Sequence, residues 1–361
     1  MPTSECTVFS ACSRRVADVL RLLGLLLTVL GAIVAAVVTW PQFFRLERTF
    51  PFAQIVSLRG VIVVAFAAVC VLMMLVALIR PLRAFAASIA IIAAIAAIAN
   101  GGILASRGLG SEALPLKTDT AIRVMTWNTA GDATDAYLIA QTAIAMQADI
   151  VALPETTIET GEAVAVAMRE MGSPMWAHHE NFGELEGYPD WAANSTTLLI
   201  SPSLGDYAVV ESTSGDASNT TTVPTVVAMP VDGIGPTIVA AHAVAPRQDD
   251  MDHWRSDLTW LADQCASDDV IMAGDFNATV DNMARLGVDD ADLGLCHDAA
   301  SATGTGAVGT WSTSWPELVG TPIDHVLATD AWTATGSVVL GSLDDSGSDH
   351  RPLVVQFEPA G

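Results

Sequence analysis

The chain begins with three long apolar stretches and continues with short apolar runs that alternate with polar segments. The long stretches cover residues 22–40, 60–79 and 84–106 and contain no charged residue. Each can cross a hydrocarbon core of about 30 Å as a helix. A cleaved signal peptide would have a shorter apolar region with no further spans behind it, and core helices of a soluble protein are rarely apolar on every face. We therefore expect three transmembrane helices in a membrane region that covers residues 1–106.

Short runs rich in β-branched and aliphatic residues recur through the rest of the chain and are typical of strands. We predict strands at residues 122–127, 150–153, 197–200, 223–229, 237–241, 270–273, 323–328 and 353–357. Apolar residues recur every three or four positions at 136–147, 162–171 and 252–265, which predicts helices. Mixed strands and helices over this length indicate one α/β (α+β) domain built on layered sheets.

A short segment separates the membrane region from this domain. Residues 107–120 contain Gly108, Gly110 and Pro115 and are typical of a linker. The predicted organisation is therefore a membrane region (1–106), a linker (107–120) and a globular domain (121–361). Two segments rich in Gly and Ser, residues 212–222 and 301–309, are expected to be surface loops.

Charge is divided as unevenly as hydrophobicity. Residues 1–117 hold ten basic and four acidic side chains, whereas residues 118–361 hold six basic and thirty-six acidic ones, a formal net charge of −30. Nucleic-acid binding draws on clustered Lys and Arg. The acidic domain therefore argues against nucleic acid as a partner. The expected partners are the membrane lipid bilayer and a phosphoester substrate, whose access must rely on a local metal site.

The sidedness of the membrane region rests on the basic residues near the span ends, which number five on each side. The four-residue connection from Arg80 to Arg83 is the more densely charged, which favours the cytoplasm for it and for the N-terminus. Three spans then place the globular domain outside the cell membrane. Cys265 and Cys296 fit this placement if they form a disulfide, and two buried free thiols are the equal alternative.

Polar residues follow several of the predicted strands at the point where each strand ends. Buried polar groups are costly unless they are paired, so such a set implies a hydrogen-bonded network or a metal site. Oxygen ligands suit a hard cation such as Mg²⁺, and a histidine next to a carboxylate suits an oriented base. The residues concerned are Asn128, Glu155, His242, Asp275, Asn277, Asp324, Asp349 and His350.

Six short segments that contain these residues resemble the endonuclease/exonuclease/phosphatase family, which includes pancreatic deoxyribonuclease, neutral sphingomyelinases and inositol-polyphosphate phosphatases. They occur in the family's order and span nearly the whole globular part. The resemblance implies a four-layered α/β/β/α sandwich and a metal-dependent phosphoesterase. The segments are Thr126-Trp127-Asn128, Pro154-Glu155, His242 with Pro246, Gly274-Asp275-Phe276-Asn277, Ile323-Asp324-His325-Val326 and Ser348-Asp349-His350-Arg351-Pro352.

The resemblance also implies which residues hold the metal. Asn128 and Glu155 would bind Mg²⁺, with Mn²⁺ or Ca²⁺ as alternatives, and Asp349 would contribute to the metal environment. The family commonly has Gln before the metal-binding Glu, whereas this chain has Pro154. This chain therefore lacks one side-chain donor near the expected metal.

The remaining site residues would carry out the chemistry that the resemblance implies, a direct in-line attack of water on phosphorus. His350 would be the general base and Asp324 would orient it. Asp275 would orient the nucleophile or a phosphate oxygen. Asn277 and His242 would donate hydrogen bonds to the charge that develops on the phosphoryl group.

For several neighbouring residues the sequence allows two different roles. Asp275 and Asn277 could instead form an Asx-turn. The loop with Trp311 and Trp315 either packs or contacts the leaving group. Arg247 and Arg255 could bind a second phosphate, or Arg255 could form a salt bridge within its helix. Some nucleases of the family supply a Tyr and an Arg from the region that corresponds to residues 180–194. Tyr188 and Asn194 are equal candidates there, and Tyr188 is not included in the expected site.

Three functions remain open at this stage because the family cleaves different esters with similar active sites. The membrane spans and the acidic domain favour hydrolysis of a phosphodiester or phosphomonoester, either a lipid headgroup or a small extracytoplasmic ester. An extracytoplasmic nuclease is the first alternative. A non-enzymatic membrane scaffold is the second, and the complete set of polar residues argues against it.

Overall fold

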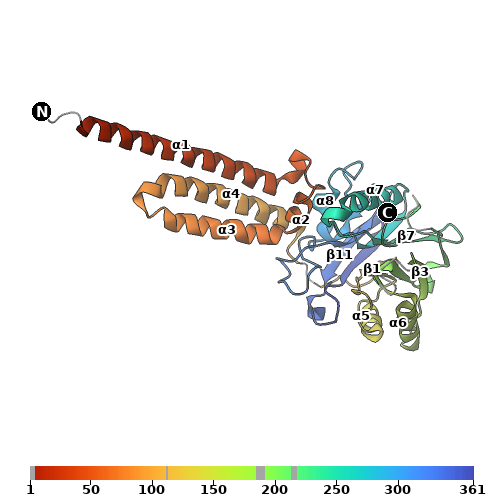
Figure 1. Cartoon of the computed structure of the whole chain (residues 1–361). Helices are drawn as coiled ribbons and strands as arrows, with labels where there is room; N and C mark the ends of the chain where they lie inside the picture. Colours follow the sequence, from red (N-terminus) through yellow and green to blue (C-terminus); the bar gives the residue numbers. More distant parts are fainter. Residues whose placement is uncertain (1–4, 111–112, 184–191, 213–217) are drawn as a thin grey trace.

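The computed structural model describes residues 5–110, 113–183, 192–212 and 218–361, and three long helices project from one end of its sheet-containing part (Figure 1). The helices are α1 (Glu5–Thr39), α3 (Arg59–Val76) and α4 (Arg83–Arg107). Within them, Asp18–Thr39, Arg59–Val76 and, with the preceding turn, Arg80–Arg107 are long and apolar enough to cross a membrane. The expectation of three apolar spans is confirmed.

Short elements connect these helices. Helix α1 leads into η1 (Pro41–Phe44) and α2 (Phe52–Ser57), and η2 (Arg80–Leu82) joins α3 to α4 at the far end. Helix α2 lies where the long helices meet the rest of the protein, next to α8 (Val280–Met283) (Figure 1). The connection between the first two spans is therefore on the same side as the globular domain.

Two six-stranded sheets form the centre of the domain. The first sheet has the order β11-β12-β1-β2-β4-β3, and the second has the order β5-β6-β7-β8-β10-β9. Strands β1 and β2 are parallel, as are β7 and β8, while β12 and β10 run antiparallel to β1 and β8. The strands are β1 (Ile122–Thr126), β2 (Ile150–Pro154), β3 (Trp176–Asn181), β4 (Ser195–Ile200), β5 (Tyr207–Val209), β6 (Val226–Pro230), β7 (Thr237–His242), β8 (Val270–Asp275), β9 (His297–Asp298), β10 (Asp324–Ala328), β11 (Trp332–Val339) and β12 (Leu353–Pro359).

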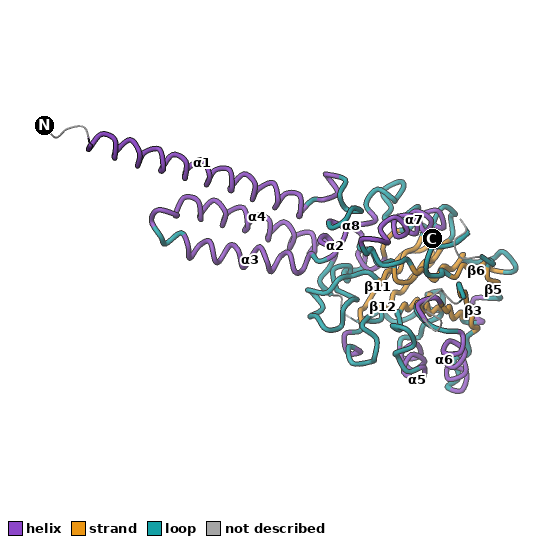
Figure 2. The backbone as a smooth tube through the Cα atoms, viewed as in Figure 1, coloured by secondary structure: helices purple, strands orange, loops and turns teal. Residues whose placement is uncertain are grey.

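Helices cover the outer faces of both sheets (Figure 2). Apolar side chains from the two sheets, such as Val124 and Ile271, share one core. Helices α5 (Ala136–Ala145) and α6 (Ile158–Glu170) bury apolar residues against the first sheet, and α7 (Met251–Gln264) does so against the second. These layers confirm the predicted fold class, an α/β sandwich preceded by three apolar helices.

The structure also differs from the expectations in several places. Strands β3, β5 and β11 were not predicted, because their residues are mixed and only partly buried. The expectation of a surface loop at 301–309 was wrong, because Thr305, Ala307 and Val308 are buried. Backbone N–H groups of this segment donate to the carbonyls of Arg107 and Gly108, at the end of α4. Tyr188 and part of the predicted loop 212–222 lie outside the described residues.

Cys265, at the end of α7, forms a disulfide with Cys296, just before β9. Both residues are fully buried. Of the two alternatives open for this pair, the structure contains the disulfide rather than two free thiols.

A buried ionic cluster connects the membrane helices to the globular domain. Asp281 accepts hydrogen bonds from Arg59 and Arg107, with N–O distances of 2.6–2.8 Å. Arg59 also donates to the side chain of Asn100 and the carbonyl of Thr39, so it links all three long helices. The predicted boundaries at 106 and 120 stay a prediction, but the two parts on either side share this cluster.

Replacing Asp281 by alanine is expected to destabilise the protein by about 3–5 kcal/mol, because two guanidinium groups would remain buried without a carboxylate. Burial opposes ionisation of Asp281, but the two arginines outweigh it and lower the pKa to about 2, below the ordinary value of 3.8. This contribution to stability is therefore complete above pH 3.8 and is lost as the pH falls towards 2. Thermal unfolding of the purified protein in detergent measures both effects. Asp252→Ala, which removes an exposed carboxylate, is the control and should change little.

Candidate active site

The fold brings the ends of four central strands to one edge of the sandwich. Asn128 and Glu155 follow the parallel strands β1 and β2, so both leave the first sheet at the same edge. His242 and Asp275 end the parallel strands β7 and β8 of the second sheet and are paired in register. Asp324 begins the antiparallel strand β10 directly opposite Asp275. This topology explains why residues far apart in the sequence meet.

The segment before β12 adds the last two residues, and neighbouring motifs hold it in place. The carbonyl of His350 accepts a 3.0 Å hydrogen bond from the indole of Trp127, which is fully buried. Ser348 donates to the carbonyl of Asn128 at 2.6 Å and accepts from the His350 N–H at 2.9 Å. The motifs around Asn128 and His350 therefore fix each other's backbone.

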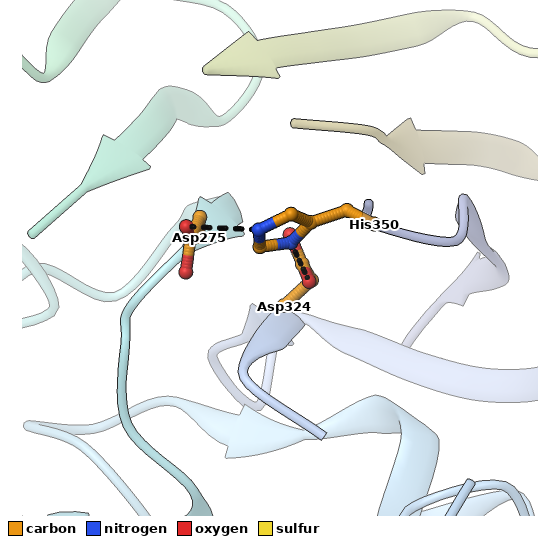
Figure 3. Close-up of side chains that lie close together, drawn as sticks. All are labelled: Asp275, Asp324 and His350. Atoms are coloured by element: carbon orange, nitrogen blue, oxygen red, sulfur yellow. Dashed lines mark hydrogen bonds and ion pairs between the residues drawn. The ribbon is translucent and has the colours of Figure 1, made fainter. Parts of the chain in front are cut away.

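His350 lies between two buried carboxylates (Figure 3). Its Nδ1 atom is 2.8 Å from Asp324 Oδ2, and its Nε2 atom is 3.9 Å from Asp275 Oδ2. Burial lowers the pKa of His350, but the charge and hydrogen bond of Asp324 outweigh burial and raise that pKa. Burial, and then the charge of Asp324, raise the pKa of Asp275. Asp324 thus fixes the ring, and Nε2 is the nitrogen turned towards Asp275.

The three residues expected to hold a metal surround this group. The Asn128 amide donates to Glu155 Oε1 at 3.1 Å and to Asp275 Oδ2 at 3.0 Å. Asp349 Oδ1 is 3.9 Å from His350 Nε2, and its Oδ2 accepts a 2.8 Å hydrogen bond from the indole of Trp311. Burial raises the pKa of Glu155. Asn128 bridges two carboxylates, so the expected ligands and the His350 group form one continuous cluster.

Asn277 and His242 complete the set. The Asn277 side chain donates to the carbonyl of Ala243 at 2.9 Å and to Asp275 Oδ2 at 3.2 Å, and its backbone N–H donates to Asp275 Oδ1. Asp275 therefore forms the Asx-type contact and also lies in the site. His242 Nε2 is 3.9 Å from Glu155 Oε1. Burial, and then the charge of His350, lower the pKa of His242 to about 3. His242 is therefore neutral at ordinary pH.

Two site residues have strained backbones. Glu155 has a φ of 55° and Asn277 a φ of 47°. This left-handed conformation costs about 1–2 kcal/mol for a residue with a side chain, although Asn tolerates it better than Glu. Strain of this kind concentrates at functional sites, and here it occurs at two of the eight residues selected from the sequence.

The donor set fits a divalent cation. Glu155, Asp275 and Asp349 bring three carboxylates to the pocket, and Asp324 lies beside them against His350. Arg247 is the one Lys or Arg that lines the pocket in the described part of the chain. Donor atoms of Asp275, Asp324 and His350 lie within 4.8 Å of one another. Asp324 Oδ1 is buried without a hydrogen-bond partner among the described residues. Carboxylate and amide oxygens in this arrangement suit a hard cation such as Mg²⁺.

A pocket of about 750 Å³ opens over the cluster, and part of its lining was missed by the sequence analysis. Four lining residues, Phe50, Gln54, Ser57 and Leu58, come from the connection between the first two membrane helices. No signal in the sequence pointed to them, because the connection between the first two spans contains no motif that relates it to the site residues of the globular domain. Trp311 also lines the pocket.

Arg247 and Arg255, the two candidates for binding a second phosphate, have different environments. Arg247 is exposed and lines the pocket. Arg255 forms an ion pair with Asp252 and donates to the carbonyl of Arg48. Of the two, Arg247 is therefore the one placed to meet a bound ester.

The comparisons with known proteins agree with this geometry. A sequence model described as the Endonuclease/Exonuclease/phosphatase family matches residues 125–350, more than half of the chain. The chain belongs to this family. Enzymes of the family hydrolyse phosphoester bonds and typically use divalent metals. No curated protein matches the chain.

Solved structures show the same fold at low identity. An endonuclease/exonuclease/phosphatase from Beutenbergia cavernae is 18% identical, with a TM-score of 0.52 over 67% of this chain and 72% of that one. D. rerio TDP2 complexed with a single-strand DNA product is 18% identical, with a TM-score of 0.50 over 66% of this chain and all of that one. A family protein from Leptotrichia buccalis is 13% identical, with a TM-score of 0.50 over 66% and 99%.

Proposed function

We propose that this protein is a membrane-anchored, divalent-metal-dependent phosphoesterase that hydrolyses a phosphodiester or phosphomonoester by direct attack of water. The observation that carries the proposal is the His350–Asp324 pair beside the carboxylates of Glu155, Asp275 and Asp349 in one pocket. A scaffold that only kept the fold would have no need for this costly cluster of buried charges.

In this proposal each residue of the site has one catalytic role. The raised pKa of His350 favours its protonated form, so the neutral form is the reactive one: its Nε2 takes a proton from the attacking water, and Asp324 holds the ring through Nδ1. Asp275 orients that water. Neutral His242 donates a hydrogen bond to a phosphoryl oxygen. The Asn277 amide could do the same only by giving up one of its hydrogen bonds to Ala243 and Asp275.

Glu155, Asn128 and Asp349 would hold the cation, together with Asp275. Asn128 presents its amide nitrogen to the carboxylates, while its oxygen accepts a 2.8 Å hydrogen bond from the Ala130 N–H. Binding the cation through that oxygen would require the amide to flip and give up this hydrogen bond. A bound Mg²⁺ would supply Lewis-acid stabilisation of the phosphoryl group. Four acidic side chains would otherwise repel a phosphate ester, so the cation also makes substrate binding feasible.

The catalytic domain is proposed to lie on the extracytoplasmic side. The Cys265–Cys296 disulfide supports this placement, because disulfides persist in oxidising compartments. Three of the five basic residues on the domain side, Arg59, Arg107 and Lys117, are in ion pairs with carboxylates of the domain. Arg80 and Arg83 form no ion pair with a described residue, which favours the cytoplasm for their turn.

A protease site inserted at Gly233, in the exposed turn between β6 and β7, tests this orientation. Protease added to intact cells should cut there, and should not cut a site inserted at Leu82 between Arg80 and Arg83. Cutting at Leu82 alone would place the catalytic domain in the cytoplasm. Lysed cells, in which both sites should be cut, are the control for accessibility.

An extracytoplasmic nuclease is the alternative function. A neighbour of the same fold has been solved with a single-strand DNA product. The formal charge of −30 on residues 118–361 opposes DNA binding. This charge makes a lipid headgroup or a small ester the preferred substrate.

A panel of substrates tests the proposal directly. Purified full-length protein would be assayed with phospholipids, soluble phosphate esters, and single- and double-stranded DNA, each with Mg²⁺ and with EDTA. Turnover of lipids or small esters that EDTA abolishes is the expected result. Turnover of DNA alone would establish the nuclease function. No turnover of any substrate would contradict the proposal and favour a non-enzymatic membrane scaffold.

A further inference from the structure

The connection between the first two membrane helices forms one wall of the active-site pocket. Phe50 and Leu58 line the pocket that also contains Glu155, Asp275 and His350. Figure 1 shows α2, which lies between Phe50 and Leu58 in the chain, at the junction of the long helices and the domain. The pocket therefore belongs to both parts of the molecule.

Buried contacts hold this wall in place. Ala53 is fully buried in the same apolar cluster as Val244 and Met251 of the catalytic domain. The Gln54 amide donates to the carbonyl of Pro246. Asn282 accepts from Ser57 at 3.0 Å and donates to the carbonyl of Ala53 at 3.2 Å. The wall is therefore part of the packed domain.

The start of α3 is also held against the catalytic domain by close contacts. Arg59 forms its ion pair with Asp281. Gly60 packs so closely against the backbone of Leu318 that a side chain at position 60 would collide with it. The membrane helix thus begins directly beside the pocket wall, which leaves little freedom for the wall to move away.

Two of the four pocket-lining residues of the wall, Phe50 and Leu58, are apolar, and the wall is continuous in the chain with the membrane region. Phe50 is 49% exposed and Leu58 is 37% exposed, although both are large apolar side chains. Exposed aromatic residues in the same connection, Trp40, Phe43 and Phe44, are typical of the interface between lipid and water. Leu58 is followed at once by the second span. An apolar group held in the bilayer can therefore reach the pocket along Leu58.

We propose that the substrate is an amphiphilic phosphoester of the membrane leaflet that faces the catalytic domain, and that Phe50 and Leu58 determine this specificity. The phosphoryl group lies at the His350 cluster, and the apolar part of the substrate lies against Phe50 and Leu58. This inference rests on the proposed phosphoesterase function. It adds that the membrane region takes part in substrate selection as well as anchoring.

Two esters that differ only in their apolar tail test the inference: methyl p-nitrophenyl phosphate and hexadecyl p-nitrophenyl phosphate. Both release p-nitrophenolate, so one readout serves for both. Full-length protein in lipid nanodiscs would be compared as wild type, Leu58→Asp, Phe50→Ser and Ile234→Ser. The quantity measured is the ratio of kcat/KM for the hexadecyl ester to that for the methyl ester. Comparing variants in the same nanodiscs cancels the partitioning of the long-chain ester into the bilayer.

We expect Leu58→Asp and Phe50→Ser each to lower this ratio about tenfold or more, because each removes apolar contact with the tail. Ile234 is 74% exposed and lies outside the pocket, so Ile234→Ser should keep the wild-type ratio. An unchanged ratio in both wall variants would overturn the inference and leave the phosphoesterase in place. Hydrolysis of neither diester by the wild type would overturn the inference, and failure on the monoester p-nitrophenyl phosphate as well would overturn the proposed function itself.

Discussion

Replacing His350 by alanine is expected to lower kcat for phosphoester hydrolysis by about 10²–10⁴-fold, the usual contribution of a general base. His350 Nε2 is the nitrogen turned towards Asp275 and the pocket, while Nδ1 is bound to Asp324. The alanine variant keeps the carboxylates that would hold a cation. It should therefore still bind Mg²⁺ while losing turnover, which separates the base from the metal site.

Two further variants make this prediction specific. His253→Ala removes an exposed histidine of α7 and should retain full activity. Asp324→Asn should lower kcat less than His350→Ala does. It should also shift the rise of activity with pH to lower pH, because the charge of Asp324 raises the pKa of His350 and the variant lacks that charge. Wild-type activity in His350→Ala would refute the role of His350, whatever the other variants do.

Replacing Glu155 by glutamine is expected to have the second large effect, a loss of cation affinity with a fall in activity of about 10²-fold at limiting Mg²⁺. Glutamine keeps the shape of the side chain and one oxygen but removes the negative charge that a hard cation prefers. The strained φ of 55° at Glu155 is unchanged by this substitution. Binding of Mn²⁺, followed by electron paramagnetic resonance, measures the affinity without relying on turnover.

The matched control for Glu155→Gln is Glu159→Gln, which removes an exposed carboxylate in the first turn of α6. This control should bind Mn²⁺ as the wild type does. Excess Mg²⁺ should restore part of the activity of Glu155→Gln, because mass action offsets weaker binding. Unaltered Mn²⁺ affinity in Glu155→Gln would show that Glu155 is not a ligand.

The regular elements were predictable where the apolar pattern was continuous. Strand β8 is buried along its whole length and reads as an unbroken apolar run before Asp275. Strand β11 has partly exposed residues on both faces, and β3 consists of Trp, Ala, two His, Glu and Asn. Such strands are specified by pairing with their neighbours, so their own sequence carries a weak signal.

The residues of the candidate site were predictable from the sequence because they stand out against the apolar strands that precede them. Polar residues at the ends of apolar strands are conspicuous, and parallel strands bring such ends to one edge. All eight residues selected in this way lie in one cluster or contact it, although their individual roles remain predictions. The segment 301–309 shows the limit of the approach, because its Gly- and Ser-rich composition hid the backbone contacts that bury it against the end of α4.

The sequence by itself determined the three apolar spans, the family, the layered α/β class and the identity of the clustered polar residues, because periodicity and strand-end polarity are local properties. Only the tertiary structure decided that Asp281 joins Arg59 and Arg107, and that Phe50 and Leu58 line the same pocket as His350. These contacts join residues more than a hundred positions apart. They depend on how the membrane helices pack against the sandwich, and no local pattern encodes that packing.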